Sequence, residues 1–272
     1  MVRFRNGNEM KNAKRLLFVV VVALTGLPQA ATIVWVSDDY SANFDQPWIN
    51  LLTSQGYTVL TAADGATTYW RTLDEAKIAV LNAADLVIVS RKTSSGEYAS
   101  SSTEVAQWNG LTAPVMCMSA YLTRNVRWKW LDGLQSEADA MMQAAVASDE
   151  IFRGVPLDGS NQVDVINSGV ASTVITAAAG SGTVLATRAT DQSVWIARWD
   201  AGAEFYPGSG TVAGGPRMFC GLGQDVSGAA YNITEAGRTI FLNAVQSLCF
   251  RKGIVGSVAE TGGSTEVWEK PA

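Results

Sequence analysis

The chain has 272 residues, a length that suits one large domain or two small ones; 47% of them are hydrophobic and 17% are charged. This apolar content supplies a core and excludes intrinsic disorder. The sequence contains no histidine, which is the usual general base near neutral pH and the commonest metal ligand. Ser-His-Asp and Cys-His mechanisms are therefore excluded within this chain.

Residues 1–30 have the pattern of a cleavable signal peptide. An apolar run over residues 16–27 follows three basic residues, and Ala30 offers a small side chain where a peptidase could cut. A membrane anchor is the alternative, but this run is shorter than the ~20 residues that span a bilayer. We therefore expect a mature protein that begins near Ala31 and is secreted, either to the periplasm or outside the cell.

Cleavage would also change the charge of the protein. Residues 1–30 hold five basic residues and one acid, so their removal lowers the net charge from −5 to −9. A surface this acidic repels nucleic acid and anionic lipid. We expect neither nucleic acid nor, once the signal is cleaved, a membrane as a partner.

Strands and helices alternate in the first half of the mature chain. Short, nearly continuous apolar runs predict buried strands at 32–37, 57–60, 85–90 and 114–119. Helices are predicted between them at 47–52, 73–83 and 101–109. This order predicts an α/β fold with three layers, in which a doubly wound, mostly parallel sheet carries helices on both faces. Ligands of such sheets bind outside the carboxyl ends of the strands.

Local signals mark where these helices begin. Pro47 suits the first turn of the first helix. Thr72 with Glu75, and Ser101 with Glu104, have the spacing of capping boxes for the next two.

The second half is richer in strands. Residues 182–187 and 194–199 predict a hairpin, 217–222 predict a further strand, and Thr234 is placed to cap a last helix that ends near residue 250. From residue 251 the chain becomes polar and rich in glycine and serine. We therefore expect one domain over 31–250 and a flexible tail over 251–272.

Three cysteines remain after cleavage: Cys117, Cys220 and Cys249. An odd number allows at most one internal disulfide. The alternatives are one disulfide or a reactive thiol, and burial of all three as small apolar side chains.

Several segments, taken in order, resemble the ThuA-like family, which is related to class I glutamine amidotransferases. Residues 150–155 (EIFRGV) resemble the family segment HPIFRGL, and the predicted hairpin resembles its paired strands. Residues 217–225 (RMFCGLGQD) resemble RVFYTSLGHD, and 238–245 (RTIFLNAV) resemble RQLLLNAI. The likeness covers roughly residues 32–250. It implies an amidotransferase-like, flavodoxin-like fold and an association with sugar metabolism.

The chain departs from this pattern where the chemistry would lie. Gln224 stands in place of the family histidine, and an amide cannot accept a proton near neutral pH. Ser119 stands where amidotransferases hold the cysteine nucleophile, and Ala120 and Tyr121 replace the glycine that follows it. A serine needs an adjacent base to attack at neutral pH. We therefore expect no catalytic residue of this kind, and no glutaminase or esterase activity.

Carboxylates follow the first strand at Asp38 and Asp39, and Glu97 and Asp225 could face them. Paired carboxylates serve glycoside hydrolysis or bind a hard cation such as Ca²⁺ or Mg²⁺. Aspartates at a strand end are also common turn and helix-cap residues, so the structural alternative stays open.

Basic and aromatic residues near the strand ends suit a polar ligand. Arg91, Lys92 and Arg124 could hold an anionic or polar group at the same edge. Trp128 and Trp130 could stack on a sugar, although aromatic residues this close to a strand commonly pack against the sheet.

Two functions are compatible with these residues. One is an exported, non-catalytic module, without a metal or cofactor, that binds a carbohydrate or a cell-surface partner. Its expected ligand contacts are Asp38, Asp39, Arg91, Ser119, Tyr121, Arg124, Gln224 and Asp225. The other is a carbohydrate-processing hydrolase or isomerase that relies on Asp38, Asp39 and Asp225, with or without a divalent metal.

Overall fold

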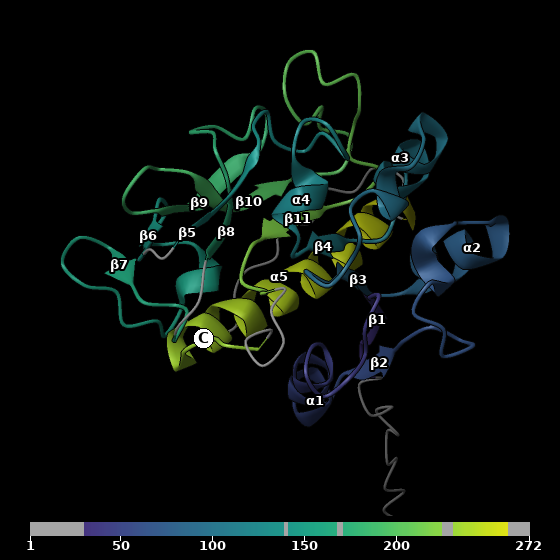
Figure 1. Ribbon diagram of the computed structural model, residues 1–272, viewed down its shortest axis with the longest axis horizontal. Coiled ribbons are helices and arrows are strands. Elements are labelled where there is room, and N and C mark those ends of the chain that lie inside the picture. Colours follow the sequence, from purple (N-terminus) through teal and green to yellow (C-terminus); the bar gives the residue numbers. More distant parts are fainter. Residues whose placement is uncertain (1–29, 139–140, 168–170, 225–230, 261–272) are drawn as a thin grey trace, which may run out of the picture.

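The computed structural model describes residues 30–138, 141–167, 171–224 and 231–260, so the signal-peptide prediction lies almost wholly outside the described residues. The described residues form one sheet, whose successive strands are labelled in Figure 1. Its main order is β2-β1-β3-β4-β11-β10-β9-β6-β7. Two strands lie off this path: β8 pairs with β10, and β5 pairs with β8. The strands are β1 (Thr32–Val36), β2 (Thr58–Leu60), β3 (Leu86–Val89), β4 (Val115–Cys117), β5 (Gln135–Ala138), β6 (Met142–Ala144), β7 (Gln162–Val163), β8 (Ala171–Val174), β9 (Thr183–Arg188), β10 (Val194–Trp199) and β11 (Arg217–Cys220).

The sheet is parallel in its front half and antiparallel in the rest. β2, β1, β3, β4 and β11 run in the same direction. β10 is antiparallel to β11, and β9, β6 and β7 continue in antiparallel pairing, as do β8 and β5. Helical crossovers join the first parallel strands, whereas tight turns such as the one between β9 and β10 suffice for antiparallel neighbours. The predicted α/β class with a strand-rich second half is confirmed.

Alternate side chains of the parallel strands enter two separate cores. One face holds Ile33, Trp35, Leu86 and Ile88 under α1 (Gln46–Ser54) and α5 (Glu235–Glu260). The opposite face holds Val34, Val36, Val87 and Val89 under α2 (Glu75–Ala83), α3 (Ser102–Asn109) and α4 (Ala120–Thr123). Residues 87 and 88 are both 0% exposed, as predicted for a central strand that is covered on both faces.

Two of the three predicted helix caps form, and the third lies two residues later than predicted. Ser101 Oγ accepts a hydrogen bond from Glu104 N at 3.2 Å, and Thr234 Oγ1 accepts one from Gly237 N at 3.1 Å. At α2 the cap is Asp74, whose Oδ1 accepts from Lys77 N at 2.8 Å, and the predicted Thr72 cap is wrong. Aspartate caps better than threonine, and here it directly precedes the first helical residue.

The last helix is longer than predicted. α5 spans 26 residues and ends at Glu260, within the predicted tail that begins at residue 251. No proline interrupts this stretch, so the backbone N–H groups needed to continue the helix are present. None of the helices in the described ranges, α5 included, is long and apolar enough to cross a membrane.

Candidate functional site

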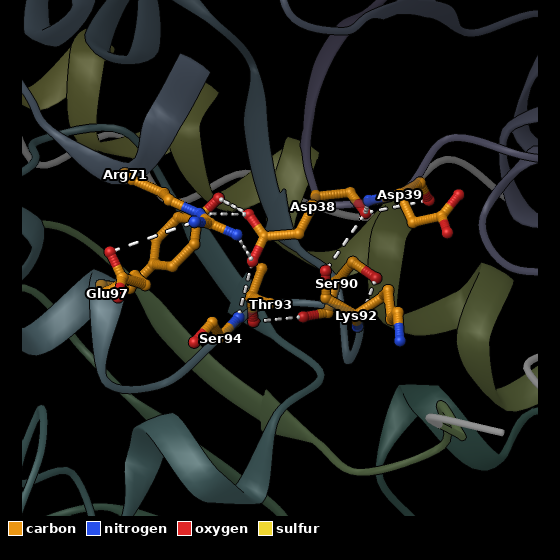
Figure 2. A network of polar contacts seen from close by, with 10 residues as sticks. Asp38, Asp39, Arg71, Ser90, Lys92, Thr93, Ser94 and Glu97 are labelled. Carbon is orange, nitrogen blue, oxygen red and sulfur yellow. Dashed lines mark hydrogen bonds and ion pairs between the residues drawn. The ribbon is translucent and has the colours of Figure 1, made fainter. Parts of the chain in front are cut away.

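Asp38 lies two residues after the end of β1, and its carboxylate is hydrogen-bonded by other parts of the protein (Figure 2). Its carboxylate accepts from Arg71 Nε at 3.1 Å, Arg71 Nη2 at 3.0 Å, Ser94 N at 2.8 Å and Tyr98 Oη at 3.1 Å. Only 10% of its side chain is exposed. Four donors occupy both oxygens of the carboxylate, so Asp38 fastens three segments together and is not placed to act as a base or metal ligand.

Of the other predicted carboxylates, neither Asp39 nor Glu97 forms a catalytic pair with Asp38. Asp39 Oδ1 accepts from Ser41 N at 2.8 Å, which is the local contact of a turn residue. Glu97 reaches the network only through Arg71, with 4.0 Å between its Oε2 and Nη1. Asp225 lies outside the described residues. Across the described ranges, no group of three or more cysteine, aspartate and glutamate residues is placed to bind a metal ion.

Asp45 is a buried carboxylic acid that the sequence analysis did not single out. It is 3% exposed, and its oxygens accept from Trp35 Nε1 at 2.9 Å and Ser90 Oγ at 2.8 Å. Burial raises the pKa of Asp45 from 3.8 to about 6, although these hydrogen bonds oppose the shift. Its position just before Pro47 indicates a helix cap, and nothing local indicates that its side chain turns toward β1 and β3.

Ser119 is sealed inside the protein. It lies between β4 and α4, is 0% exposed, and its Oγ has no hydrogen-bond partner. Its φ of −105° and ψ of 107° are ordinary extended values, whereas a nucleophile elbow is strained and presents its hydroxyl to substrate. Ala120 and Leu122 are buried in α4, and Ser119, which directly precedes this helix, is buried beside them. The prediction that Ser119 contacts a ligand is therefore wrong.

Arg91, Tyr121 and Arg124 do come together, as the sequence analysis expected of residues at this edge. The Arg91 and Arg124 guanidinium carbons lie 4.6 Å and 5.4 Å from the centre of the Tyr121 ring. Arg91 Nη2 forms an ion pair with Glu137 Oε1 at 2.9 Å, and Arg124 Nη1 donates to Gln135 Oε1. We call these five residues the arginine–tyrosine cluster.

The loop after β11 packs directly against this cluster. A Cβ atom at Gly223 would lie 2.7 Å from the Cβ of Arg91, so a side chain at this position would force Arg91 to move. Gln224, the next residue, is 4% exposed. Its predicted role as a ligand contact is wrong, because Gln224 is buried in a loop that packs closely against Arg91.

The two tryptophans considered for sugar stacking belong to the core. Trp128 and Trp130 are 0% exposed, and their rings lie 5.5 Å apart. Trp128 Nε1 donates to Tyr98 O and Trp130 Nε1 donates to Asn109 Oδ1, both at 2.8 Å. Their polar atoms are therefore used inside the protein, and the packing alternative is confirmed.

Cys117 and Cys220 are also buried, in opposite cores of the sheet, so they cannot form a disulfide with each other. Burial raises the pKa of both thiols to about 12, which leaves them protonated and unreactive at neutral pH. Cys249 is half-buried on α5.

A separate shallow concavity of about 460 Å³ lies around the turn of 3₁₀ helix at Glu150–Phe152. It contains none of the predicted site residues. Of its two acidic residues, Asp149 forms an ion pair with Arg198 at 3.0 Å, and Glu150 Oε1 accepts a hydrogen bond from Ser247 Oγ.

Comparison with known proteins yields similarity to solved structures alone. No protein-family model and no curated protein matches the chain. Among solved structures, a glutamine amidotransferase from Thermotoga maritima is similar, with 8% sequence identity and a TM-score of 0.36. The aligned part covers 85% of this chain and 90% of that one. A likeness at this level does not assign the chain to a family.

Proposed function

We propose that the protein is an exported, non-catalytic ThuA-like module that binds a carbohydrate at the carboxyl ends of its parallel strands. The observation that carries this proposal is the burial of the Ser119 hydroxyl. Ser119 stands at the nucleophile position of the family that the sequence resembles. Its hydroxyl is fully buried and lacks a partner that could accept its proton. Acyl transfer from such a residue would require both exposure of the hydroxyl and a base.

The arginine–tyrosine cluster offers partly exposed side chains at this edge. Tyr121 and Arg124 are only partly buried, and both follow β4 within a few residues. Guanidinium groups and a phenol supply several hydrogen-bond donors together with an aromatic surface, a combination that suits sugar hydroxyls and acidic substituents.

The alternative, a hydrolase or isomerase that relies on carboxylates, gains no support from the same edge. Asp38 uses both oxygens for internal hydrogen bonds. Asp45 has a raised pKa of about 6, which suits acid–base chemistry, but at 3% exposure it has no access to a substrate.

A glycan screen on the protein without residues 1–30, scored for binding and for product, tests this proposal. We expect binding without turnover, and weaker binding after Tyr121→Ala or Arg124→Ala. Arg153→Ala is the matched control, because Arg153 is exposed and lies outside the cluster. Formation of a sugar product would contradict the proposal, and so would binding that neither cluster variant weakens.

A further inference from the structure

The arginine–tyrosine cluster contains two cations and one carboxylate. Arg91 has its counter-charge in Glu137, whereas the side-chain contact of Arg124 in β5 is the neutral amide of Gln135. Among the described residues, no carboxylate forms an ion pair with Arg124. The nearby Asp132 carboxylate accepts instead from Asn125 Nδ2 at 3.2 Å.

The surroundings of Arg124 disfavour a lone positive charge. Its Nε is buried and has no hydrogen-bond partner. Burial lowers the pKa of Arg124, and the positive charge of Arg127, three residues later, lowers that pKa further. A half-buried guanidinium under these conditions is stabilised by an anion that completes its hydrogen bonds.

Strand β5, which Arg124 contacts through Gln135, shows on which face of the sheet such an anion would bind. Gln135 and Glu137 are two residues apart on β5, so their side chains share one face. Ser172 on β8 pairs with Glu137 in register, which places its side chain on that face as well. Ser172 is 2% exposed, and its Oγ is buried without a hydrogen-bond partner. This hydroxyl lies on the face that carries the cluster, but its burial leaves Arg124 as the group that an anion would meet.

From this arrangement we infer that the cluster is a subsite for the carboxylate of an acidic sugar, with Arg124 as the residue that binds it. The inference rests on the proposed function and specifies its ligand as a uronic acid. A planar guanidinium matches a carboxylate in shape and can donate two parallel hydrogen bonds to it. Within the cluster, Arg91 already donates one such hydrogen bond to the Glu137 carboxylate, at 2.9 Å.

The test uses tri-galacturonate and its methyl ester, which differ only in the charge and the methyl groups, with binding measured by isothermal titration calorimetry. We expect the wild-type protein to bind the acid at least roughly tenfold more tightly than the ester, as a charge-assisted hydrogen bond would give. Arg124→Gln should remove this preference by deleting the cation. Gln135→Glu should remove it by supplying the missing carboxylate from β5, while keeping Arg124 in place.

Two controls separate binding from folding. Arg153→Gln removes an exposed arginine outside the cluster and should leave the preference unchanged. Thermal unfolding of Gln135→Glu should occur at or above the wild-type temperature, because the variant adds a favourable ion pair. A loss of acid preference in this variant therefore cannot be ascribed to unfolding.

The outcomes distinguish this inference from the proposed function. Equal affinity for acid and ester, or a preference that survives both cluster variants, would overturn the acidic-sugar subsite and leave a neutral-sugar module standing. Equal competition by sodium acetate would also overturn it, because the site would then accept any carboxylate. A wild-type protein that binds no glycan of the wider screen would overturn the function itself.

Discussion

The buried Asp45 carboxyl makes the stability of the protein depend on pH, and a substitution of Asp45 isolates this dependence. The pKa of its carboxyl is about 6 in the folded protein, against an ordinary value of 3.8. Between these values the folded state binds a proton that the unfolded state does not, so stability falls as pH rises from about 4 to about 6. At 1.36 kcal/mol for each pKa unit, the loss is on the order of 3 kcal/mol above pH 6.

Asp45→Asn should remove this dependence while preserving the local contacts. The amide oxygen can accept from Trp35 Nε1, and the amide nitrogen can donate to Ser90 Oγ, because a hydroxyl both donates and accepts. The free energy of unfolding of the variant minus that of the wild type should therefore rise by about 3 kcal/mol from pH 4 to pH 7.5. Other titrating groups are common to both proteins and cancel in this difference.

The assay is urea unfolding of both proteins at the two pH values, followed by tryptophan fluorescence. Asp64→Asn is the matched control, since Asp64 is an exposed loop aspartate. A difference that stays constant within about 0.5 kcal/mol would refute the reasoning, because extrapolated unfolding energies resolve a change of 3 kcal/mol. It would mean that the hydrogen bonds from Trp35 and Ser90 offset the effect of burial on the Asp45 pKa.

Three further outcomes are expected. Ile88→Ala should lower the free energy of unfolding by about 2–5 kcal/mol in urea titration, because Ile88 is 0% exposed in a central strand; a loss under 1 kcal/mol would contradict that placement. Asp38→Asn should cost roughly 2–4 kcal/mol, since it removes a bidentate ion pair, whereas Asp39→Asn should cost less than about 1 kcal/mol; similar losses in the two variants would remove the distinction drawn between them. A fluorophosphonate probe should not label the protein, and stoichiometric labelling that disappears in Ser119→Ala would restore the enzyme hypothesis.

Most strands and helix starts were predictable because the residues that specify each of them lie within it or directly before it. Continuous apolar runs marked β1, β3 and β4, and Ser101 and Thr234 cap the helices that follow them. The longer reach of α5 was missed because a glycine-rich, polar composition favours a tail without excluding a helix.

The candidate site was predictable only in part, because its geometry depends on contacts between distant residues. The strand-end rule correctly brought Arg91, Tyr121 and Arg124 to one edge. It could not show that Asp38 is occupied by Arg71, 33 residues away, or that Asp45 contacts Ser90, 45 residues away. Burial of Ser119 likewise depends on how α4 packs, which no spacing in the sequence encodes.

The division of the core into two faces gives each face its own optical reporter. Trp35 and Trp48 stack on the face covered by α1 and α5, with ring centres 6.4 Å apart and an interplanar angle of 25°. Trp108 and Trp128 stack on the opposite face at 5.3 Å and the same angle. Coupled indole transitions produce a circular dichroism signal that vanishes when the rings separate. Replacing Trp35 or Trp48 by phenylalanine removes the pair on the first face, so the remaining signal follows the melting of the opposite face, where Trp128 also lies 5.5 Å from Trp130.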